Sequence, residues 1–273
     1  MNNEYLPKRA VIEGIRDETF DVKTFTLRLK DKAGALKYKP GQFMILSLPG
    51  YGEAPFTFSS CPAKDGRFQI SVKKIGSLTQ AMHELGKNDA VGVRGPYGNS
   101  FPLDEMKNKD ILFVAGGIGM APLRSAIQHV FKNRKDYGKV EIIYGARTPQ
   151  DMVYKEEIET WRNVPDTDIQ LTVDMPDNAW GGACGVVCVL FPKIKLSPKN
   201  TITILCGPPV MIKFAIKDIL KLGFKERSIY ASLERYMKCG IGKCGHCYIK
   251  GKYVCVDGPN FSYAQMKELG VES

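Results

Sequence analysis

The sequence predicts a β plus α/β chain: an N-terminal antiparallel β-barrel, then a parallel-sheet α/β domain, then a small cysteine-rich segment. Three observations support this order. Short segments up to about residue 102 alternate apolar and polar side chains, whereas apolar runs joined by helical stretches begin after residue 110. Four of the eight cysteines then fall between Cys239 and Cys255. We predict domains at 1–105, 106–225 and 226–273, because 273 residues suffice for two cores and an appendage.

The first domain is expected to be a barrel of short antiparallel strands. Residues 22–29 alternate at period two, and residues 42–48 and 67–72 do so in part. A glycine turn at 76–79 leads into a helical pattern, where free N–H groups and the helix dipole attract phosphate. Ser77 as an ordinary helix cap explains the same turn equally well.

The second domain is expected to hold a nucleotide at the ends of its strands. Residues 111–115 form an apolar run that ends in the glycine turn at 116–122, and a helical pattern separates this turn from the next apolar run. Strand, glycine turn, helix and strand form a βαβ unit, which binds ligands at the carboxyl ends of its strands. The turn departs from G-x-G-x-x-G because Pro122 occupies the last position. Further expected elements are strands at 139–147, 168–173 and 201–206 and a helix at 209–222.

The C-terminal segment carries cysteines in the order C-x4-C-x2-C, followed by a fourth cysteine after seven residues. This order is the plant-type ligand pattern of a [2Fe-2S] cluster. The predicted ligands are Cys239, Cys244, Cys247 and Cys255. Glycines between them allow tight turns that bring backbone N–H groups close to sulfide.

Other uses of these thiols are less consistent with the spacing. A structural zinc site usually has two C-x2-C pairs, and disulfides suit small secreted domains, so both remain alternatives to the cluster. A c-type haem is excluded because Tyr248, and not histidine, follows Cys247.

The composition restricts the class of protein. The formal charge of +10 is spread along the chain, and no nucleic-acid-binding motif accompanies it, so we expect no nucleic-acid partner. Dinucleotide phosphates and a thiolate-bound cluster would balance part of the charge. The lysines around the cysteines suit either an acidic partner or a merely solvated face. No apolar run reaches the length of a membrane span and no signal-peptide core is visible, so we predict no membrane span and a cytoplasmic protein.

Taken together, these residues resemble the ferredoxin-NADP reductase superfamily, in which a flavin-binding barrel precedes a Rossmann-like nicotinamide-binding domain. Residues 232–247 are the most specific match and resemble the flavin and iron-sulfur subunits of multi-subunit redox enzymes. Within that group the chain is similar to gamma subunits of sulfhydrogenases and hydrogenases and to the electron-transfer subunit of anaerobic sulfite reductase. It is more distantly similar to the electron-transfer subunit of dihydroorotate dehydrogenase.

The resemblance implies a flavin site built on the family motif R-x-Y-[ST], which falls here on Ala54, Pro55, Phe56 and Thr57. Phe56 would cover the ring face and Thr57 would lie near N5 as a catalytic residue, but Ala54 removes the phosphate-binding cation. The neighbouring Phe58 and Ser59 are included in the expected site. Phosphate anchoring then rests on Lys73, Gly76, Ser77, Leu78 and Thr79. FAD is the expected cofactor, and FMN stays open.

The resemblance also implies a nicotinamide site, with NADH favoured over NADPH. The matching residues are Gly116, Gly117, Gly119, Ala121, Pro122, Arg147, Cys206, Gly207 and Pro208. Cys206 is the second expected catalytic residue, because a small side chain there lets the hydride carbon approach flavin N5. The implied activity is that of a diaphorase subunit, which moves electrons between NAD(P)H, FAD and the cluster and exchanges them with a partner hydrogenase or reductase subunit. The alternatives are a dihydroorotate dehydrogenase subunit and a flavin-free metal-binding assembly module.

Overall fold

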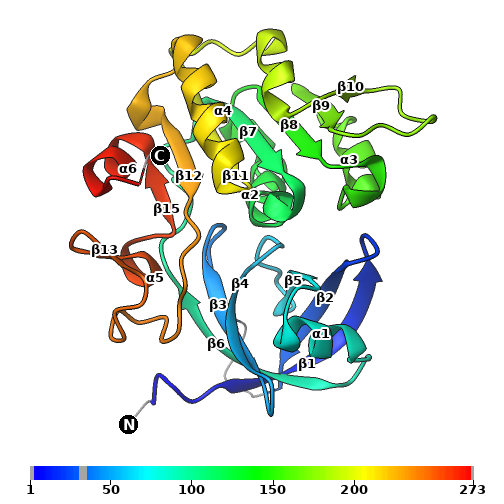
Figure 1. Cartoon of the computed structure of the whole chain (residues 1–273), viewed down its shortest axis with the longest axis vertical. Coiled ribbons are helices and arrows are strands. Elements are labelled where there is room, and N and C mark those ends of the chain that lie inside the picture. Colours follow the sequence, from blue (N-terminus) through cyan, green and yellow to red (C-terminus); the bar gives the residue numbers. More distant parts are fainter. Residues whose placement is uncertain (1–2, 31–35, 272–273) are drawn as a thin grey trace.

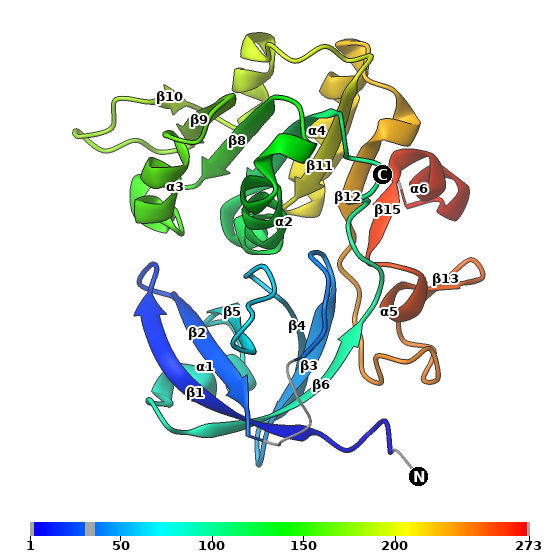
Figure 2. The same cartoon turned by 180° about the vertical axis from the view of Figure 1, so that it is seen from behind.

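The computed structural model describes residues 3–30 and 36–271, which fold into a barrel, a parallel-sheet domain above it and a C-terminal segment beside both (Figures 1 and 2). The barrel confirms the prediction of an antiparallel N-terminal domain. Its elements are β1 (Lys8–Asp17), β2 (Val22–Leu29), β3 (Phe43–Leu48), β4 (Gly52–Thr57), β5 (Arg67–Lys73), α1 (Ser77–Glu84) and β6 (Ala90–Tyr97).

All neighbouring barrel strands pair antiparallel, in the order β4-β3-β6-β1-β2-β5. The two end strands approach each other just after β4, where the Ser59 N–H donates to the Gln69 carbonyl at 2.8 Å. Alternate residues of β1, β2 and β5 point into the barrel core, among them Phe25 and Phe68. Phe58, which follows β4, is buried in the same core. Period-two patterning therefore places one side of each strand in the barrel core.

The second domain contains a seven-stranded sheet that is parallel except for its last pair, as the βαβ pattern predicts. Its strands are β7 (Asp110–Gly116), β8 (Val140–Ala146), β9 (Thr167–Val173), β10 (Ala183–Cys184), β11 (Thr201–Cys206), β12 (Ile229–Ser232) and β15 (Asn260–Ser262). Its longer helices are α2 (Met120–Lys132), α3 (Lys155–Trp161) and α4 (Pro209–Lys221). Strand β12 lies beyond residue 225 and pairs with β11, so the sheet extends past the boundary expected from the sequence.

The strand order β10-β9-β8-β7-β11-β12-β15 reverses direction at β7. The chain runs from β7 outward to β9 and β10 and then returns to β11 on the other side of β7. Such a switch point leaves a crevice at the carboxyl ends of the two strands, where α/β proteins bind ligands. In Figure 1 these ends point down toward the barrel.

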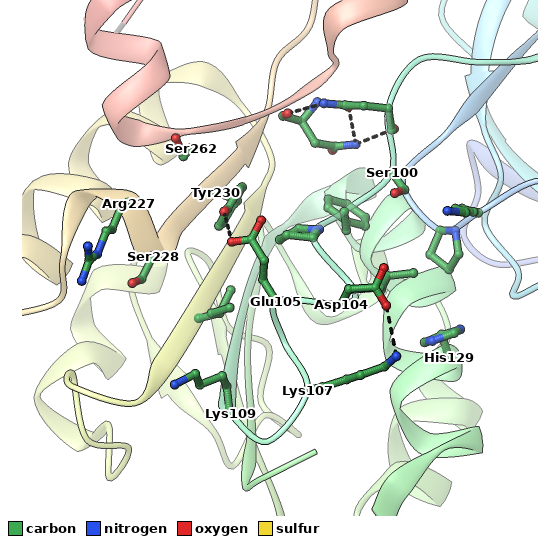
Figure 3. Close-up of a pocket in the computed structure, with 18 of the residues that line it drawn as sticks. Ser100, Asp104, Glu105, Lys107, Lys109, His129, Arg227, Ser228, Tyr230 and Ser262 are labelled. Atoms are coloured by element: carbon green, nitrogen blue, oxygen red, sulfur yellow. Dashed lines mark hydrogen bonds and ion pairs between the residues drawn. The ribbon is translucent and has the colours of Figure 1, made fainter. Parts of the chain in front are cut away.

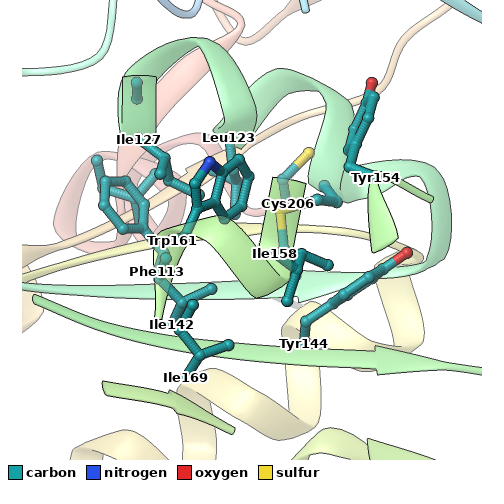
Figure 4. Close-up of a cluster of buried hydrophobic side chains, with 14 of the residues drawn as sticks. Phe113, Leu123, Ile127, Ile142, Tyr144, Tyr154, Ile158, Trp161, Ile169 and Cys206 are labelled. Carbon is teal, nitrogen blue, oxygen red and sulfur yellow. The ribbon is translucent and has the colours of Figure 1, made fainter. Parts of the chain in front are cut away.

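Two cores cover the faces of the parallel sheet. On one face, Phe113, Ile142 and Ile169 pack against Leu123 and Trp161 from the helices (Figure 4). On the other face, α4 covers the sheet, and its core is continuous with the C-terminal segment. The sheet is thus buried on both sides, which explains why β7 reads as an apolar run and why every residue of β8 and β11 is buried.

The C-terminal segment packs against the outer side of the barrel. It adds a two-stranded sheet, β13 (Tyr248–Ile249) with β14 (Lys252–Tyr253), and the helices α5 (Val254–Asp257) and α6 (Tyr263–Leu269). Phe43 and Ile45 of β3 share one core with Cys247, Val254 and Cys255. A barrel strand and the predicted metal-binding segment are therefore parts of one packed unit.

Candidate functional site

The predicted nicotinamide turn lies at the switch point, against the loop that follows β11. A Cβ atom at Gly119 would run into the Cys206 carbonyl and would lie 2.7 Å from the Gly207 nitrogen. A Cβ at Gly207 would lie 3.1 Å from the Gly116 nitrogen. Glycine is thus required because two backbones meet here, and this contact brings together the turn and the loop that were predicted separately.

A cavity of about 530 Å³ opens beside this contact. Its walls include the predicted residues Gly116, Gly117, Arg147 and Pro208, and also Asp174, Val210, Met211 and Phe214, which sequence reasoning missed. Asp174 follows β9 directly, as Arg147 follows β8, so the signal that could have found it is its position at a strand end. The cavity has the apolar walls and few charged groups that suit a nucleotide.

Cys206 ends β11 and is buried. Burial raises the pKa of its thiol to about 12, and the charge of Glu234 acts in the same direction. The thiol therefore stays protonated and neutral, and it can act as a small uncharged wall but not as a thiolate nucleophile.

The predicted flavin motif lies on β4, and the chain after this strand leads to Ser59, which contacts Arg124 of the second domain. Pro55, Phe56 and Thr57 are half-buried, so each retains surface for a ring to cover. Phe58 is completely buried and stacks on Tyr38 with ring centroids 3.8 Å apart. Its side chain belongs to the barrel core, and so any contact of Phe58 with a cofactor would be through the backbone.

Ser59 is likewise buried and serves the contact between domains. Its carbonyl accepts a 2.7 Å hydrogen bond from Arg124 of α2, and its hydroxyl lies 3.3 Å from that of Ser71. Arg124 in turn pairs with Glu157 of α3 at 2.7 Å. This connection was not visible in the sequence, since its members come from four separate elements.

The predicted phosphate turn begins α1. Thr79 Oγ1 accepts hydrogen bonds from the backbone N–H groups of Ile75, at 2.9 Å, and of Gly76, at 2.8 Å. This arrangement leaves the N–H groups of Ser77 and Leu78 without an intrahelical partner, as at any helix start. Lys73 lies next to the turn, but its ammonium group is 3.3 Å from Asp21. The residues fit a phosphate held chiefly by backbone donors.

The four predicted cluster ligands lie within residues 239–255, which we call the cluster loop: Cys239, Cys244 and Cys247 precede β13, and Cys255 lies on α5. The thiols of Cys239, Cys247 and Cys255 are buried, and that of Cys244 is exposed. Backbone N–H groups point at their sulfurs: Gly242 to Cys255 at 3.2 Å and Lys243 to Cys239 at 3.3 Å. Gly240, Gly242 and Gly245 all have positive φ, which lets the loop curl around the thiols.

The thiols are arranged in two pairs. Cys244 lies beside Cys239, and Cys255 lies beside Cys247. The His246 backbone N–H faces Cys244 and lowers the pKa of that thiol to about 7, whereas burial raises the pKa of Cys255 to about 12. Within 3–30 and 36–271, no three His, Cys, Asp or Glu side chains surround one metal-ion position. The four thiols together supply the four thiolate ligands that a [2Fe-2S] cluster takes.

A larger cavity, of about 1090 Å³, opens at the amino end of the parallel sheet (Figure 3). Its wall contains several lysines together with Asp104, which pairs with Lys107 at 3.0 Å, and Glu105, which accepts a hydrogen bond from Tyr230 at 2.8 Å. Its lining residues include none of those predicted for a cofactor.

None of the helices described is long and apolar enough to cross a membrane.

Three family models match successive parts of the chain. The oxidoreductase FAD-binding domain matches residues 10–101, and the oxidoreductase NAD-binding domain matches residues 113–217. The iron-sulfur cluster binding domain of dihydroorotate dehydrogenase B matches residues 234–267. Their order is the order of the three predicted regions.

Two curated relatives are similar over nearly the full chain. Sulfhydrogenase 1 subunit gamma of Pyrococcus furiosus is 38% identical over 96% of this chain and 92% of its own length. A probable dihydroorotate dehydrogenase B (NAD(+)) electron transfer subunit of Methanocaldococcus jannaschii is 36% identical over 92% of this chain and 87% of its own length.

Solved structures show the same fold. A chain of the NADH-dependent reduced ferredoxin-NADP oxidoreductase is 26% identical with a TM-score of 0.76 and covers 98% of this chain and 93% of its own. The cytochrome b5 reductase domain of Ulva prolifera nitrate reductase has a TM-score of 0.70 over 83% of this chain and 97% of its own. From its fold, its cysteine loop and these matches, the chain belongs to the family of electron-transfer subunits that combine ferredoxin-reductase-like FAD- and NAD-binding domains with an iron-sulfur domain.

Proposed function

We propose that this subunit exchanges electrons between NADH and a partner redox subunit, through FAD on β4 and a [2Fe-2S] cluster in the loop 239–255. One observation carries the proposal. The cluster loop packs on β3, which is the direct neighbour of the flavin strand β4, while the nicotinamide turn faces the barrel from the second domain. The three predicted sites are thus adjacent in the order that electrons would need.

The order follows from electron counts. A nicotinamide delivers two electrons as a hydride and an iron-sulfur cluster takes one, and a bound flavin supplies chemistry that accommodates both. The protein therefore has to position rings and exclude water, and no side chain has to act as an acid or base.

The chain's own residues serve this positioning. Phe56 offers a ring face, and the Thr57 hydroxyl offers a hydrogen bond at the end of β4. The contact between Gly119 and Cys206 keeps the nicotinamide crevice narrow. Because Ala54 offers no cation, the start of α1 with its backbone donors carries the phosphate contact.

Asp174 supports NADH as the preferred nucleotide. It lies in the same cavity as Arg147, at the strand ends where a ribose would lie. A carboxylate accepts hydrogen bonds from a ribose 2'-hydroxyl but repels a 2'-phosphate. Arg147 alone would favour the phosphate, and so the pair predicts a preference for NADH that Asp174→Ser should weaken.

The partner is proposed to be a catalytic subunit of a hydrogenase or sulfur-reducing complex, as the name of the Pyrococcus relative suggests. A dihydroorotate dehydrogenase complex is the alternative, since several relatives carry that name. A cytoplasmic location remains part of the proposal.

The test is anaerobic purification followed by spectroscopy. We expect FAD, about two irons per chain and a visible spectrum that bleaches when NADH is added. The flavin absorbance, followed by stopped flow, should fall first. The electron paramagnetic resonance (EPR) signal of the reduced cluster should appear later, in samples frozen at successive times. A protein with iron but without flavin would contradict the proposal.

A second candidate is a flavin-free metal-binding assembly module, which Ala54 favours because the phosphate-binding cation of the motif is missing. A colourless protein that binds zinc and no flavin would establish this candidate. Flavin retained through gel filtration would exclude it.

A further inference from the structure

Arg94 connects the barrel to the cluster loop. It lies on β6 and is 5% exposed. Its Nη1 donates to the Cys239 carbonyl at 3.0 Å, and its Nη2 is 3.4 Å from the Lys238 carbonyl. A buried guanidinium is thus placed against the peptide of the first cluster ligand.

The same guanidinium reaches the strand of the flavin motif. Arg94 Nη2 pairs with Glu53 Oε1 at 2.8 Å, and Glu53 is the residue before Ala54 on β4. One side chain therefore links the flavin strand to the cluster loop. Its two terminal nitrogens are occupied by these partners, so Arg94 does not replace the cation that is missing at Ala54.

The barrel surface next to Gly240 determines how closely the cluster loop can approach β3 and β6. Gly240 has a φ of +80°, and a Cβ there would lie 2.8 Å from the Tyr97 ring and 3.1 Å from Ile45. The loop thus follows the barrel surface at the closest approach that glycine permits. Arg94 supplies the directional contacts to Lys238 and Cys239. Further along the same side, Asn99 donates to the Asp257 and Asn260 carbonyls at 3.0 and 2.7 Å.

We propose that Arg94 is a positioning residue that holds the cluster loop against the flavin strand and, with Glu53, sets the reduction potential of the cluster. This inference rests on the proposed function. Reduction adds one electron to the cluster, so a cation in a poorly solvated position favours the reduced state and an anion opposes it. Arg94 raises the potential, and Glu53 lowers it by neutralising part of that charge.

Two variants test the proposal because they shift the potential in opposite directions. Arg94→Gln removes the cation and should lower the midpoint potential of the cluster. Glu53→Gln leaves the cation unpaired and should raise it. The shift in Arg94→Gln should correspond to about a tenfold change in the one-electron equilibrium, which is about 59 mV. The shift in Glu53→Gln should be smaller, because the Glu53 side chain is 41% exposed and solvent screens its charge.

The measurement is an EPR-monitored redox titration of the holoprotein, with iron and flavin content determined in parallel. Arg67→Gln is the matched control, because Arg67 pairs with Asp65 on the barrel surface, 51% exposed, and should leave the potential unchanged. Flavin reduction by NADH should proceed at the wild-type rate in all three variants, since neither Arg94 nor Glu53 contacts the nucleotide site.

The outcomes are distinct. Shifts of the same sign, or no shift in either variant, would overturn the proposal. If Arg94→Gln loses its iron, recovery of iron in Arg94→Lys supports the positioning role, and the potential of Glu53→Gln still decides the charge effect. A wild-type cluster that NADH cannot reduce through the flavin would instead refute the proposed function.

Discussion

The barrel forms two contacts that differ in their balance of polar and apolar groups. Toward the nucleotide domain the contact is polar and buried: Arg124 pairs with Glu157, which also reaches Arg16 of β1 at 2.8 Å, and the Tyr154 hydroxyl bonds to Ser71. Toward the cluster segment the contact is a continuous apolar core with hydrogen bonds at its border, where Arg94 donates to the Cys239 carbonyl and Asn99 bonds to Asn260.

This difference fits the two tasks. Hydride transfer needs ring planes in one geometry, and directional hydrogen bonds specify geometry better than apolar contacts do. Single-electron transfer depends chiefly on short distance and exclusion of water, which close packing provides. We therefore expect that a substitution can disrupt either contact and leave the other intact. The largest effects on electron transfer are expected where a predicted metal ligand or a close backbone contact is lost.

Replacing Cys244 by serine should break the cluster side alone. Cys244 is the exposed one of the four predicted ligands, so its loss should remove or alter the cluster without opening the buried core around Cys247. We expect electron transfer to a cluster-dependent acceptor to be abolished while NADH still bleaches the flavin. Acceptor assays and stopped-flow absorbance measure the two steps separately.

Cys184→Ser is the control, because Cys184 is another exposed thiol but lies on β10, outside the loop. It should behave as the wild type in both assays. Unimpaired cluster-dependent transfer in Cys244→Ser would contradict the division of tasks between the two contacts.

Gly119→Ala should break the nucleotide side alone. The added Cβ collides with the Cys206 carbonyl and forces the glycine turn away from the loop after β11, where the nicotinamide is proposed to bind. A displacement of about 1 Å can reduce a rate about a hundredfold, and we expect a loss of that size in flavin reduction by NADH. A chemical reductant should still reduce the cluster fully, and Gly181→Ala, whose Cβ meets no atom within 4 Å, should change neither process.

Much of this arrangement could be predicted from the sequence, because it depends on local patterns. The period-two strands, the glycine turn before α2 and the spacing of Cys239, Cys244 and Cys247 each reflect a local requirement on the backbone or the metal. The helix expected at 209–222 is α4, and the cluster-binding region matches the iron-sulfur model.

The contacts between regions could not be predicted in the same way. Arg124, Glu157 and Arg16 are far apart in the sequence, and each reads as an ordinary surface charge until the fold brings it to the same place. Arg94 was missed for this reason too. Phe58 follows the predicted flavin motif directly, yet its ring stacks on Tyr38 in the barrel core, which a motif match cannot reveal.

Glu157→Gln should weaken the polar contact by about 3 kcal/mol, because it leaves Arg124 buried without its charged partner. The matched control is Glu159→Gln on the same helix. Glu159 pairs with Arg162 at the surface, with 66% of its side chain exposed, so this variant should change the unfolding free energy by less than about 0.5 kcal/mol. Urea denaturation of both variants measures the difference in unfolding free energy. Equal losses would show that the buried Arg124–Glu157 pair stabilises the fold no more than an exposed ion pair does.

The smallest expected effect is a dependence of the same contact on pH. Burial tends to raise the pKa of Glu157, but its bonds to Arg124 and Arg16 outweigh burial and hold that pKa below its ordinary value. A lowered pKa in the folded state contributes stability that is present above the ordinary carboxylate pKa and is lost as the pH falls through the lowered value. Wild type should therefore lose more unfolding free energy than Glu157→Gln between about pH 5 and pH 3. Because both proteins carry the same cysteine loop, acid effects on the cluster cancel in the comparison, and parallel pH curves would rule out this contribution from Glu157.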